Sequence, residues 1–127
     1  MKRYLTATTL MQYERLRKRT QFEKRIDNLF QRLIFKRDHV CLRCGKQEDL
    51  LVFYIFGKEN ESLRWDPTNA FLMESLCLLE ADEFAVKHIG FKRYDTLRVK
   101  AGFHFHRNQA DLVYLERELN QKLKEVK

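Results

Sequence analysis

The segments CLRCG at residues 41–45, SLRWDPTN at residues 62–69 and ESLC at residues 74–77 decide the fold that the sequence predicts. All three cysteines of the chain, its one proline and its one tryptophan lie within residues 41–77. Two cysteines with two residues between them, followed by glycine, can form a tight turn that wraps a metal ion, because glycine allows a positive φ. The sequence therefore predicts a small module built around a metal-binding turn.

Four side chains in these segments are the predicted metal ligands. Cys41 and Cys44 form one pair, and Glu74 and Cys77 form a second pair with the same two-residue gap. A structural zinc ion takes four ligands, with Zn–S distances of about 2.3 Å, and a carboxylate is an accepted though rarer ligand. We therefore predict a structural zinc site. The alternative is a turn without metal, in which Cys77 is buried as a small apolar side chain.

The composition is that of a folded, basic protein. The chain has 127 residues, of which 44% are hydrophobic and 34% charged, and its net charge is +7. This composition excludes a disordered chain, and the positive charge favours a polyanionic partner such as nucleic acid. No apolar run is long enough to span a bilayer, and the initial residues MKRYL lack the apolar core of a signal peptide. We therefore expect a cytoplasmic protein with no membrane partner, in which three cysteines serve as thiols or metal ligands.

Long helices are predicted at both ends of the chain. Apolar side chains recur every three or four residues up to about position 37, which predicts a helix that starts at Thr8 or Thr9. A second helix is predicted from Asn108 or Asp111 onward. Its leucine stripe suits packing against the first helix better than dimer formation, because two heptads are too short for a stable coiled coil. The oligomeric state stays open.

Between these helices the pattern predicts strands and short helices. Residues 50–56 are apolar and rich in β-branched and aromatic side chains, which predicts a strand. Residues 63–65 are the predicted returning strand of a hairpin, and a helix is predicted to start near Asn69. Helical patterns then cover residues 79–89 and residues 91–100, separated by a glycine that is suited to end a helix.

Residues 28–100 resemble the HNH (ββα-metal) endonucleases, and most of all the NinG-type recombination nucleases of phages. The resemblance rests on DHVCLRCG at residues 38–45, on the apolar strand that follows, and on LRWDPTN at residues 63–69. The Cys-x-x-Cys pair that follows in the family falls on Glu74 and Cys77. The resemblance implies an α+β fold with a ββα-metal core and a zinc-knuckle-like turn, flanked by long N- and C-terminal helices.

The resemblance also implies how the chain is divided and where it acts. Residues 1–37 form a basic N-terminal helical arm, residues 38–102 a degenerate HNH-like core, and residues 103–127 a C-terminal helix. A relative of these nucleases is expected to come from a phage and to act in the cytoplasm of the host cell.

The catalytic side chains of the family are missing from this sequence. An HNH nuclease cleaves a phosphodiester bond with one divalent ion and a histidine as general base. In the resemblance that histidine and its neighbour fall on Phe53 and Tyr54, and the last metal ligand falls on Leu78. Phenylalanine and leucine cannot bind the ion, and tyrosine, with a pKa near 10, is a poor base at neutral pH. Only Asn69 is kept, and its role in the family is to hold the loop that carries the base.

These replacements predict a catalytically inactive protein that binds DNA, or a DNA-processing protein of phage or host, without cleavage. Two other functions stay open. A divergent HNH endonuclease with a rearranged metal site would use His104, His106 or Glu74, because two imidazoles two positions apart on an extended segment point to the same side. A protein-binding inhibitor or regulator of a host or phage enzyme would instead use the apolar replacements as its contact surface.

Two groups of basic side chains are the predicted contacts to the DNA backbone. One group lies in the N-terminal helix and the other follows the nuclease-like core. Each phosphate that they neutralise adds roughly 0.9 to the salt dependence of log K. The alternative is that these side chains are solvated helix surfaces. The predicted contacts are Arg15, Arg17, Lys18, Arg19, Lys24 and Arg25 in the first group, and Lys87, Lys92, Arg93, Arg98 and Lys100 in the second.

Overall fold

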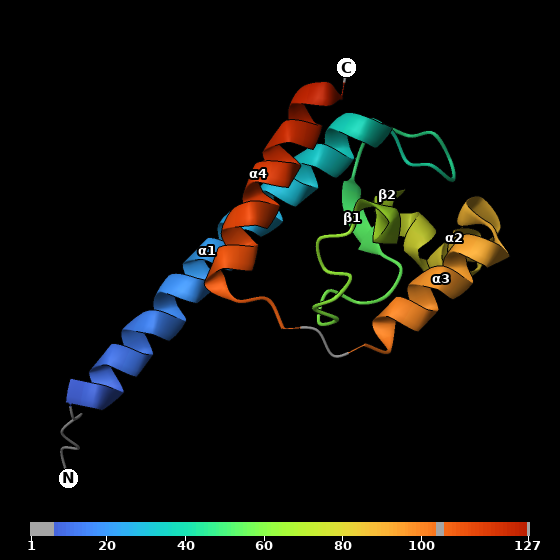
Figure 1. The fold of residues 1–127 in the computed structure, drawn as a ribbon. Coiled ribbons are helices and arrows are strands. Elements are labelled where there is room, and N and C mark those ends of the chain that lie inside the picture. The colour runs from blue at the N-terminus through green and yellow to red at the C-terminus, as the bar shows by residue number, and fades with distance from the viewer. Residues whose placement is uncertain (1–6, 104–105, 127) are drawn as a thin grey trace, which may run out of the picture.

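The structure is a computed structural model that describes residues 7–103 and 106–126. Two long helices, α1 (Ala7–Asp38) and α4 (Gln109–Glu125), lie side by side, and a small β-hairpin separates them from two short helices (Figure 1). The fold therefore belongs to the α+β class, as the sequence predicts. None of the helices in the described residues is long and apolar enough to cross a membrane.

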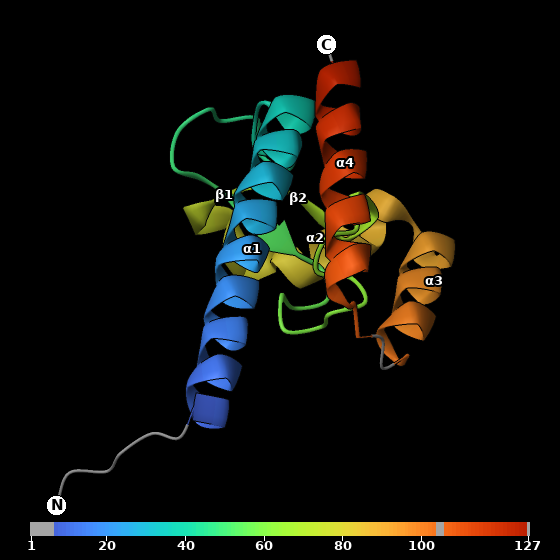
Figure 2. The same ribbon diagram turned by 60° about the vertical axis from the view of Figure 1, so that its left-hand side comes forward.

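Helix α1 runs for 32 residues without interruption, because its sequence holds no glycine or proline. It begins slightly earlier than predicted and ends at Asp38, where His39 takes a positive φ of 65°. The side chains that it buries belong to its C-terminal half, where Phe30 and Ile34 are fully covered. The start of α1 projects beyond the first turn of α4 (Figure 2), and residues 9–18 are exposed.

Helix α4 packs along the C-terminal half of α1, which confirms the predicted packing within one chain. Its first turn is fixed by a capping box, in which Asn108 and Asp111 exchange side-chain to backbone hydrogen bonds of 2.8 and 3.0 Å. The leucine stripe of α4 is buried against α1, while Arg25 and Glu116 form an ion pair of 2.6 Å beside it.

The sheet is an antiparallel pair of β1 (Leu50–Tyr54) and β2 (Ala70–Glu74), in which Val52 lies opposite Leu72. The predicted returning strand at residues 63–65 is wrong, because these residues lie in turns. The helix predicted to start near Asn69 is also wrong, because β2 begins at the next residue. All five residues of β2 are buried, so the strand shows no alternation, and a short apolar run cannot be told from a helix by periodicity.

The turn before β2 explains why the chain extends there. Asp66 caps the 3₁₀ turn η1 (Pro67–Asn69) by accepting a hydrogen bond of 3.0 Å from the Thr68 amide, and Pro67 fixes the first φ. Asn69 is fully buried. Its side chain bonds both backbone groups of Phe56 at 2.9 Å and donates to the Leu63 carbonyl at 3.2 Å. This asparagine therefore holds the two ends of the long β1–β2 loop together.

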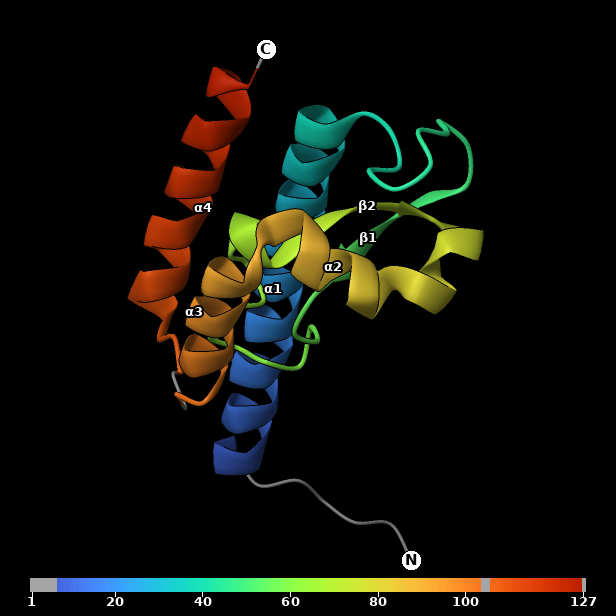
Figure 3. The ribbon, with the colours of Figure 1, turned by 90° about the vertical axis from the view of Figure 1, so that its right-hand side faces the viewer.

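The hairpin packs on both of its faces. Figure 3 shows the short helices α2 (Ala81–Ile89) and α3 (Phe91–Ala101) on the side of the hairpin away from α1. Ala70 and Leu72 pack with residues of α1 and α4, whereas Phe71 and Met73 pack with residues of the 3₁₀ helix η2 (Ser75–Glu80) and of α2. The buried cluster on the helix-pair side comprises Ile26, Leu29, Phe30, Leu33, Ile34, Trp65, Ala70, Leu72, Leu112, Leu115 and Leu119. The cluster on the other side comprises Cys41, Phe71, Met73, Cys77, Ala81 and Ala85.

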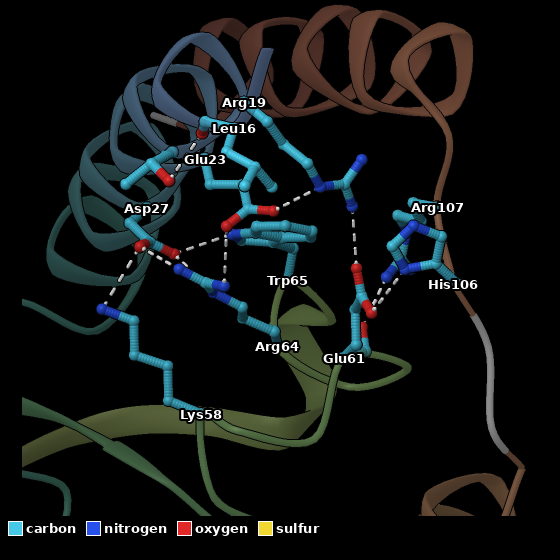
Figure 4. Close-up of polar contacts among 11 residues, drawn as sticks. Leu16, Arg19, Glu23, Asp27, Lys58, Glu61, Arg64, Trp65, His106 and Arg107 are labelled. Carbon is cyan, nitrogen blue, oxygen red and sulfur yellow. Dashed lines mark hydrogen bonds and ion pairs between the residues drawn. The ribbon is translucent and has the colours of Figure 1, made fainter. Parts of the chain in front are cut away.

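The β1–β2 loop is tied to α1 through a buried carboxylate (Figure 4). Asp27 is only 5% exposed and accepts hydrogen bonds of 3.1 and 2.7 Å from the Arg64 guanidinium and of 2.8 Å from the Trp65 indole. Lys58 adds an ion pair of 3.2 Å. Burial alone would raise the pKa of Asp27, but the hydrogen bonds from Arg64 and Trp65 outweigh it and lower that pKa below its ordinary value.

Candidate metal centre and basic surfaces

Three of the four predicted metal ligands come together in the structure. Cys41 and Cys44 lie in the turn after α1, and Cys77 lies in the 3₁₀ helix η2 (Ser75–Glu80) after β2. Their sulfur atoms all lie within 4.8 Å of one another. Cys41 and Cys77 are buried and Cys44 is exposed, and none of the three is in a disulfide. Thiolates from two separate segments are thus placed to share one ion.

The turn is shaped by its own backbone. The Gly45 amide donates to the Cys41 carbonyl at 2.8 Å, and the Cys41 amide donates to the Lys46 carbonyl at 2.9 Å. Gly45 has a φ of 79°, which a residue with a side chain rarely adopts. A hydrogen bond of 3.2 Å from the Leu42 amide to the Leu72 carbonyl fixes the turn against β2. The sequence prediction of a tight turn is therefore confirmed, and its position relative to Cys77 is set by the sheet.

The thiols of the cluster differ in acidity. Burial alone would raise the pKa of Cys41, but backbone hydrogen bonds from Cys44, Glu74 and Arg43 lower it to about 7. The hydrogen bond from the Arg43 side chain alone would lower the pKa of Cys77. Burial and the neighbouring thiols outweigh this effect and raise the pKa of Cys77 to about 11. A divalent ion among the three sulfurs would stabilise all of them as thiolates.

Arg43 is a part of this centre that the sequence prediction missed. Its guanidinium donates to the Cys77 sulfur at 3.5 Å and forms an ion pair with Glu80 on the same 3₁₀ helix. Three thiolates around a divalent ion carry one excess negative charge, which a neighbouring guanidinium offsets. The available signal was a cation between the two cysteines of the turn, but only the fold shows that it reaches Cys77.

Glu74 lies at the edge of the cluster. Its carboxylate is buried, and one of its oxygens lies 3.6 Å from the Cys77 sulfur, but it does not belong to the group formed by the three cysteines. The chain therefore offers three sulfur ligands and one adjacent carboxylate, which is the donor set of a tetrahedral site with a weaker fourth position.

The positions that the resemblance aligns with the catalytic side chains of HNH nucleases are occupied by packed, largely apolar groups. Phe53 and Tyr54 point to opposite faces of the hairpin, since neighbouring residues of a strand alternate. The Phe53 ring lies 5.4 Å from that of Phe71 in one cluster, and the Tyr54 ring stacks on Phe30 at 5.9 Å in the other. Leu78 is half-buried against the Phe53 cluster. Burial raises the pKa of Tyr54 above its ordinary value, so even less of it is the phenolate that could act as a base at neutral pH.

Two of the described histidines, His106 and His88, contact residues other than Phe53, Tyr54 and Leu78. His106 lies next to α4 and contacts the Glu61 carboxylate at 3.3 Å (Figure 4). His88, on α2, stacks on Phe84 at 5.3 Å and lies 5.6 Å from Phe71, so it covers the edge of the aromatic cluster. The predicted candidate His104 lies outside the described residues.

Four of the predicted DNA contacts form ion pairs with acidic side chains in the described part of the chain. Arg19 pairs with Glu23 at 3.0 Å and with Glu61 at 3.1 Å, and Arg25 pairs with Glu116. In the second group, Arg98 pairs with Asp95 at 2.8 Å and Lys100 lies 3.7 Å from an Asp66 oxygen. Seven of the predicted contacts are exposed and form no ion pair with any residue that the structure describes. These are Arg15, Arg17, Lys18, Lys24, Lys87, Lys92 and Arg93.

Comparisons with models of protein families, with curated proteins and with solved structures find nothing that matches this chain. Any function of this chain is therefore inferred from its own residues and their geometry. Two features bear on function. One is the cluster of three thiols beside a hairpin that is packed on both faces. The other is the set of exposed cations on α1 and on the α2–α3 pair.

Proposed function

We propose that the protein is a catalytically inactive relative of the HNH endonucleases, of phage origin, that binds DNA without cleaving it. The observation that carries this proposal is the packing of Phe53 and Tyr54 into two separate cores. An HNH nuclease needs a base and a metal ligand at these positions, both open to the phosphodiester. Rings that face opposite sides of the hairpin cannot converge on one phosphate.

The order of the elements supports the relationship to the ββα-metal fold. An antiparallel hairpin is followed by a helix, and the cysteine cluster lies where η2 leads from β2 into α2. Asn69 holds the β1–β2 loop, which is the role that this residue has in the family. A zinc ion held by Cys41, Cys44 and Cys77, with Glu74 beside it, would supply a structural link between the turn and η2.

The distribution of positive charge supports DNA as the partner. The net charge is +7, and the seven predicted DNA contacts that form no ion pair with a described residue lie on α1 and on the α2–α3 pair. Backbone phosphates are contacted by such side chains without regard to sequence. The mechanism is occupancy: the protein covers DNA in the cytoplasm of the host cell and leaves the phosphodiester bonds intact.

Binding and cleavage assays test the proposal together. A fluorescently labelled duplex titrated with the protein should bind at low salt, and log K should fall with log salt by roughly 0.9 for each phosphate contacted. Supercoiled plasmid incubated with Mg²⁺, Mn²⁺ or Zn²⁺ should stay uncut. Absence of binding at low salt would overturn the DNA partner. Metal-dependent nicking that disappears in a His104→Ala/His106→Ala variant would establish the divergent nuclease instead.

A second candidate function, binding to a DNA-processing protein of phage or host, is favoured by a different observation. Leu76 and Leu79 are 74% and 93% exposed on η2, and residues three apart lie on the same side of a 3₁₀ helix. Phe53, Tyr54 and Leu78, the predicted contact surface, are each partly buried in a core cluster. A pull-down from host lysate should recover one stoichiometric protein, and Leu76→Ser/Leu79→Ser should release it, if this function holds.

A further inference from the structure

A pocket of about 520 Å³ lies where the end of α1, the start of β2 and the α2–α3 pair meet. Its volume is within the range of roughly 300–1,000 Å³ that small-ligand sites occupy. Part of its lining is apolar, from residues such as Leu42 and Ile89, and its polar part comes largely from basic side chains. An apolar lining with a few convergent polar groups is the usual make-up of a binding site.

The charge of the pocket is positive. Arg37, Arg93 and Lys100 line it, and Asp38 is its one acidic lining residue. Asp38 is already neutralised, because its two oxygens accept hydrogen bonds of 2.7 Å from Arg37 and 3.0 Å from the Leu72 amide. The pocket therefore favours an anion.

Two of the three cations are available to that anion. Arg37 uses four of its five N–H donors on Asp38 and on the carbonyls of Pro67 and Ala70, at 2.8 and 2.7 Å, so its main contribution to the pocket is positive charge. Arg93 is exposed and has no ion-pair partner among the residues that the structure describes. Lys100 is held only by the 3.7 Å contact to Asp66, with its side chain 55% exposed.

A second pocket, of about 460 Å³ on the side of α4, is less suited to an anion. Three cations, Lys100, Arg107 and Lys122, line it, but so do Asp66 and Glu118. The α2–α3 pocket has no such opposing pair. It also lies on the part of the surface that carries the free cations Lys87 and Lys92.

We propose that the α2–α3 pocket binds one nucleotide unit of a DNA strand, with its phosphate at Arg93 and Lys100. The imidazole of His88 lines the same pocket and can donate a hydrogen bond to a phosphate oxygen. The apolar lining formed by Leu42 and Ile89 takes the sugar or base, which a site for a bare phosphate would not need. This inference rests on the proposed DNA binding and assigns one contact site for the strand.

The test uses a small probe and a matched pair of variants. The probe is deoxyadenosine 5′-monophosphate, followed by amide chemical shifts of the full chain, with deoxyadenosine as its uncharged counterpart. The monophosphate should shift amides around the pocket, between His88 and Lys100, and the nucleoside should not. Arg93→Gln/Lys100→Gln should abolish these shifts. Arg117→Gln/Lys124→Gln, which removes two exposed charges from α4, should keep them.

A DNA titration of the same variants separates this inference from the proposed function. Loss of the pocket contacts should weaken duplex binding about tenfold, while the α4 control changes it much less, since charge-assisted hydrogen bonds are lost only in the pocket. If the wild type binds DNA, yet both variants bind alike and the monophosphate leaves the pocket amides unmoved, the pocket is wrong and DNA binding stands. Pocket shifts without any DNA binding would retain the pocket and refute the proposed function.

Discussion

The two faces of the hairpin are held in different ways. On one face large apolar side chains of α1 and α4 form the core, and the buried Asp27 carboxylate ties the β1–β2 loop to α1. On the other face the core is built largely from small side chains, such as Ala81 and Ala85, and from the thiols of Cys41 and Cys77. The first face is therefore closed by its own large side chains, whereas the second would be completed by a metal ion held by the thiols.

The second face is the one whose stability a bound metal ion would raise. Burial of large apolar side chains stabilises by about 25 cal/mol per Å², and alanine and cysteine offer little of that area. A bound zinc ion would link the Cys41 turn to η2 and so replace the missing apolar contacts. Each change below perturbs one face of the hairpin, and the other face serves as the internal reference.

The largest effect is expected from removal of the metal. The protein as purified should contain about one zinc ion per chain, and Cys41→Ser should release it, because three thiolates are the minimum of the donor set. Binding of structural zinc contributes roughly 10–16 kcal/mol of folding free energy in zinc-finger peptides. Without the ion, η2 and α2 should therefore lose protection against amide hydrogen exchange. The α1–α4 pair should remain protected.

The control for metal removal is restoration. Zinc added to chelated wild type should recover the exchange pattern of η2 and α2, and zinc added to Cys41→Ser should not. A wild type that contains no metal, or an η2–α2 segment whose protection is the same with and without zinc, would show that the cysteine face is self-sufficient after all.

The next largest effect should come from Asp27→Ala. The substitution leaves Lys58 and the Trp65 indole without their acceptor and leaves Arg64 only its 3.4 Å contact with Glu23. Breaking a buried ion pair in this way costs about 3–5 kcal/mol. Urea unfolding should show this loss, while the zinc content stays the same. Asp95→Ala, which breaks the exposed pair with Arg98, is the control and should cost less than about 1 kcal/mol.

Much of the first face could be predicted from the sequence, because helix periodicity is local. The spacing of Phe30 and Ile34 predicts the buried side of α1, and the leucine stripe predicts the packing of α4. The Asp27 cluster could not be predicted in the same way, since Asp27 and its main partner Arg64 are brought together only by the fold. No local pattern marks such a pair.

The second face was predictable only in part. The spacing of Cys41 and Cys44 predicts the turn, and Cys77 was correctly placed beside it. The strand β2 was predicted as a helix, because both of its faces are buried and a strand buried on both faces lacks the alternation that identifies it. With the strand misassigned, nothing in the sequence could show that Arg43 reaches Cys77.

A smaller effect concerns acid stability and belongs to the first face alone. The folded-state pKa of Asp27 lies below its ordinary value of 3.8, since burial, which raises it, is outweighed by hydrogen bonds from Arg64 and Trp65. A carboxyl with a depressed pKa contributes stability that is complete above its ordinary pKa and is lost as the pH falls through the folded-state value. Urea midpoints of the wild type between about pH 2 and pH 5 should therefore fall more steeply than those of Asp27→Asn. Parallel curves would show that another carboxyl controls the acid limb.

The smallest effect is expected from Arg43, which lies beside the cysteine cluster of the second face. Arg43→Gln removes the guanidinium that donates to the Cys77 sulfur and pairs with Glu80, but it leaves all three thiols in place. Neighbours of this kind tune metal affinity by about 10–100-fold, so zinc should bind about tenfold more weakly while its stoichiometry is unchanged. Competition with a chromophoric chelator measures this shift. Lys46→Gln removes an exposed charge from the same turn, next to Gly45, and should leave the affinity within about twofold, because a solvated charge is screened. Equal losses in both variants would mean that only the overall charge of the turn matters, and that Arg43 does not act through its contact with Cys77.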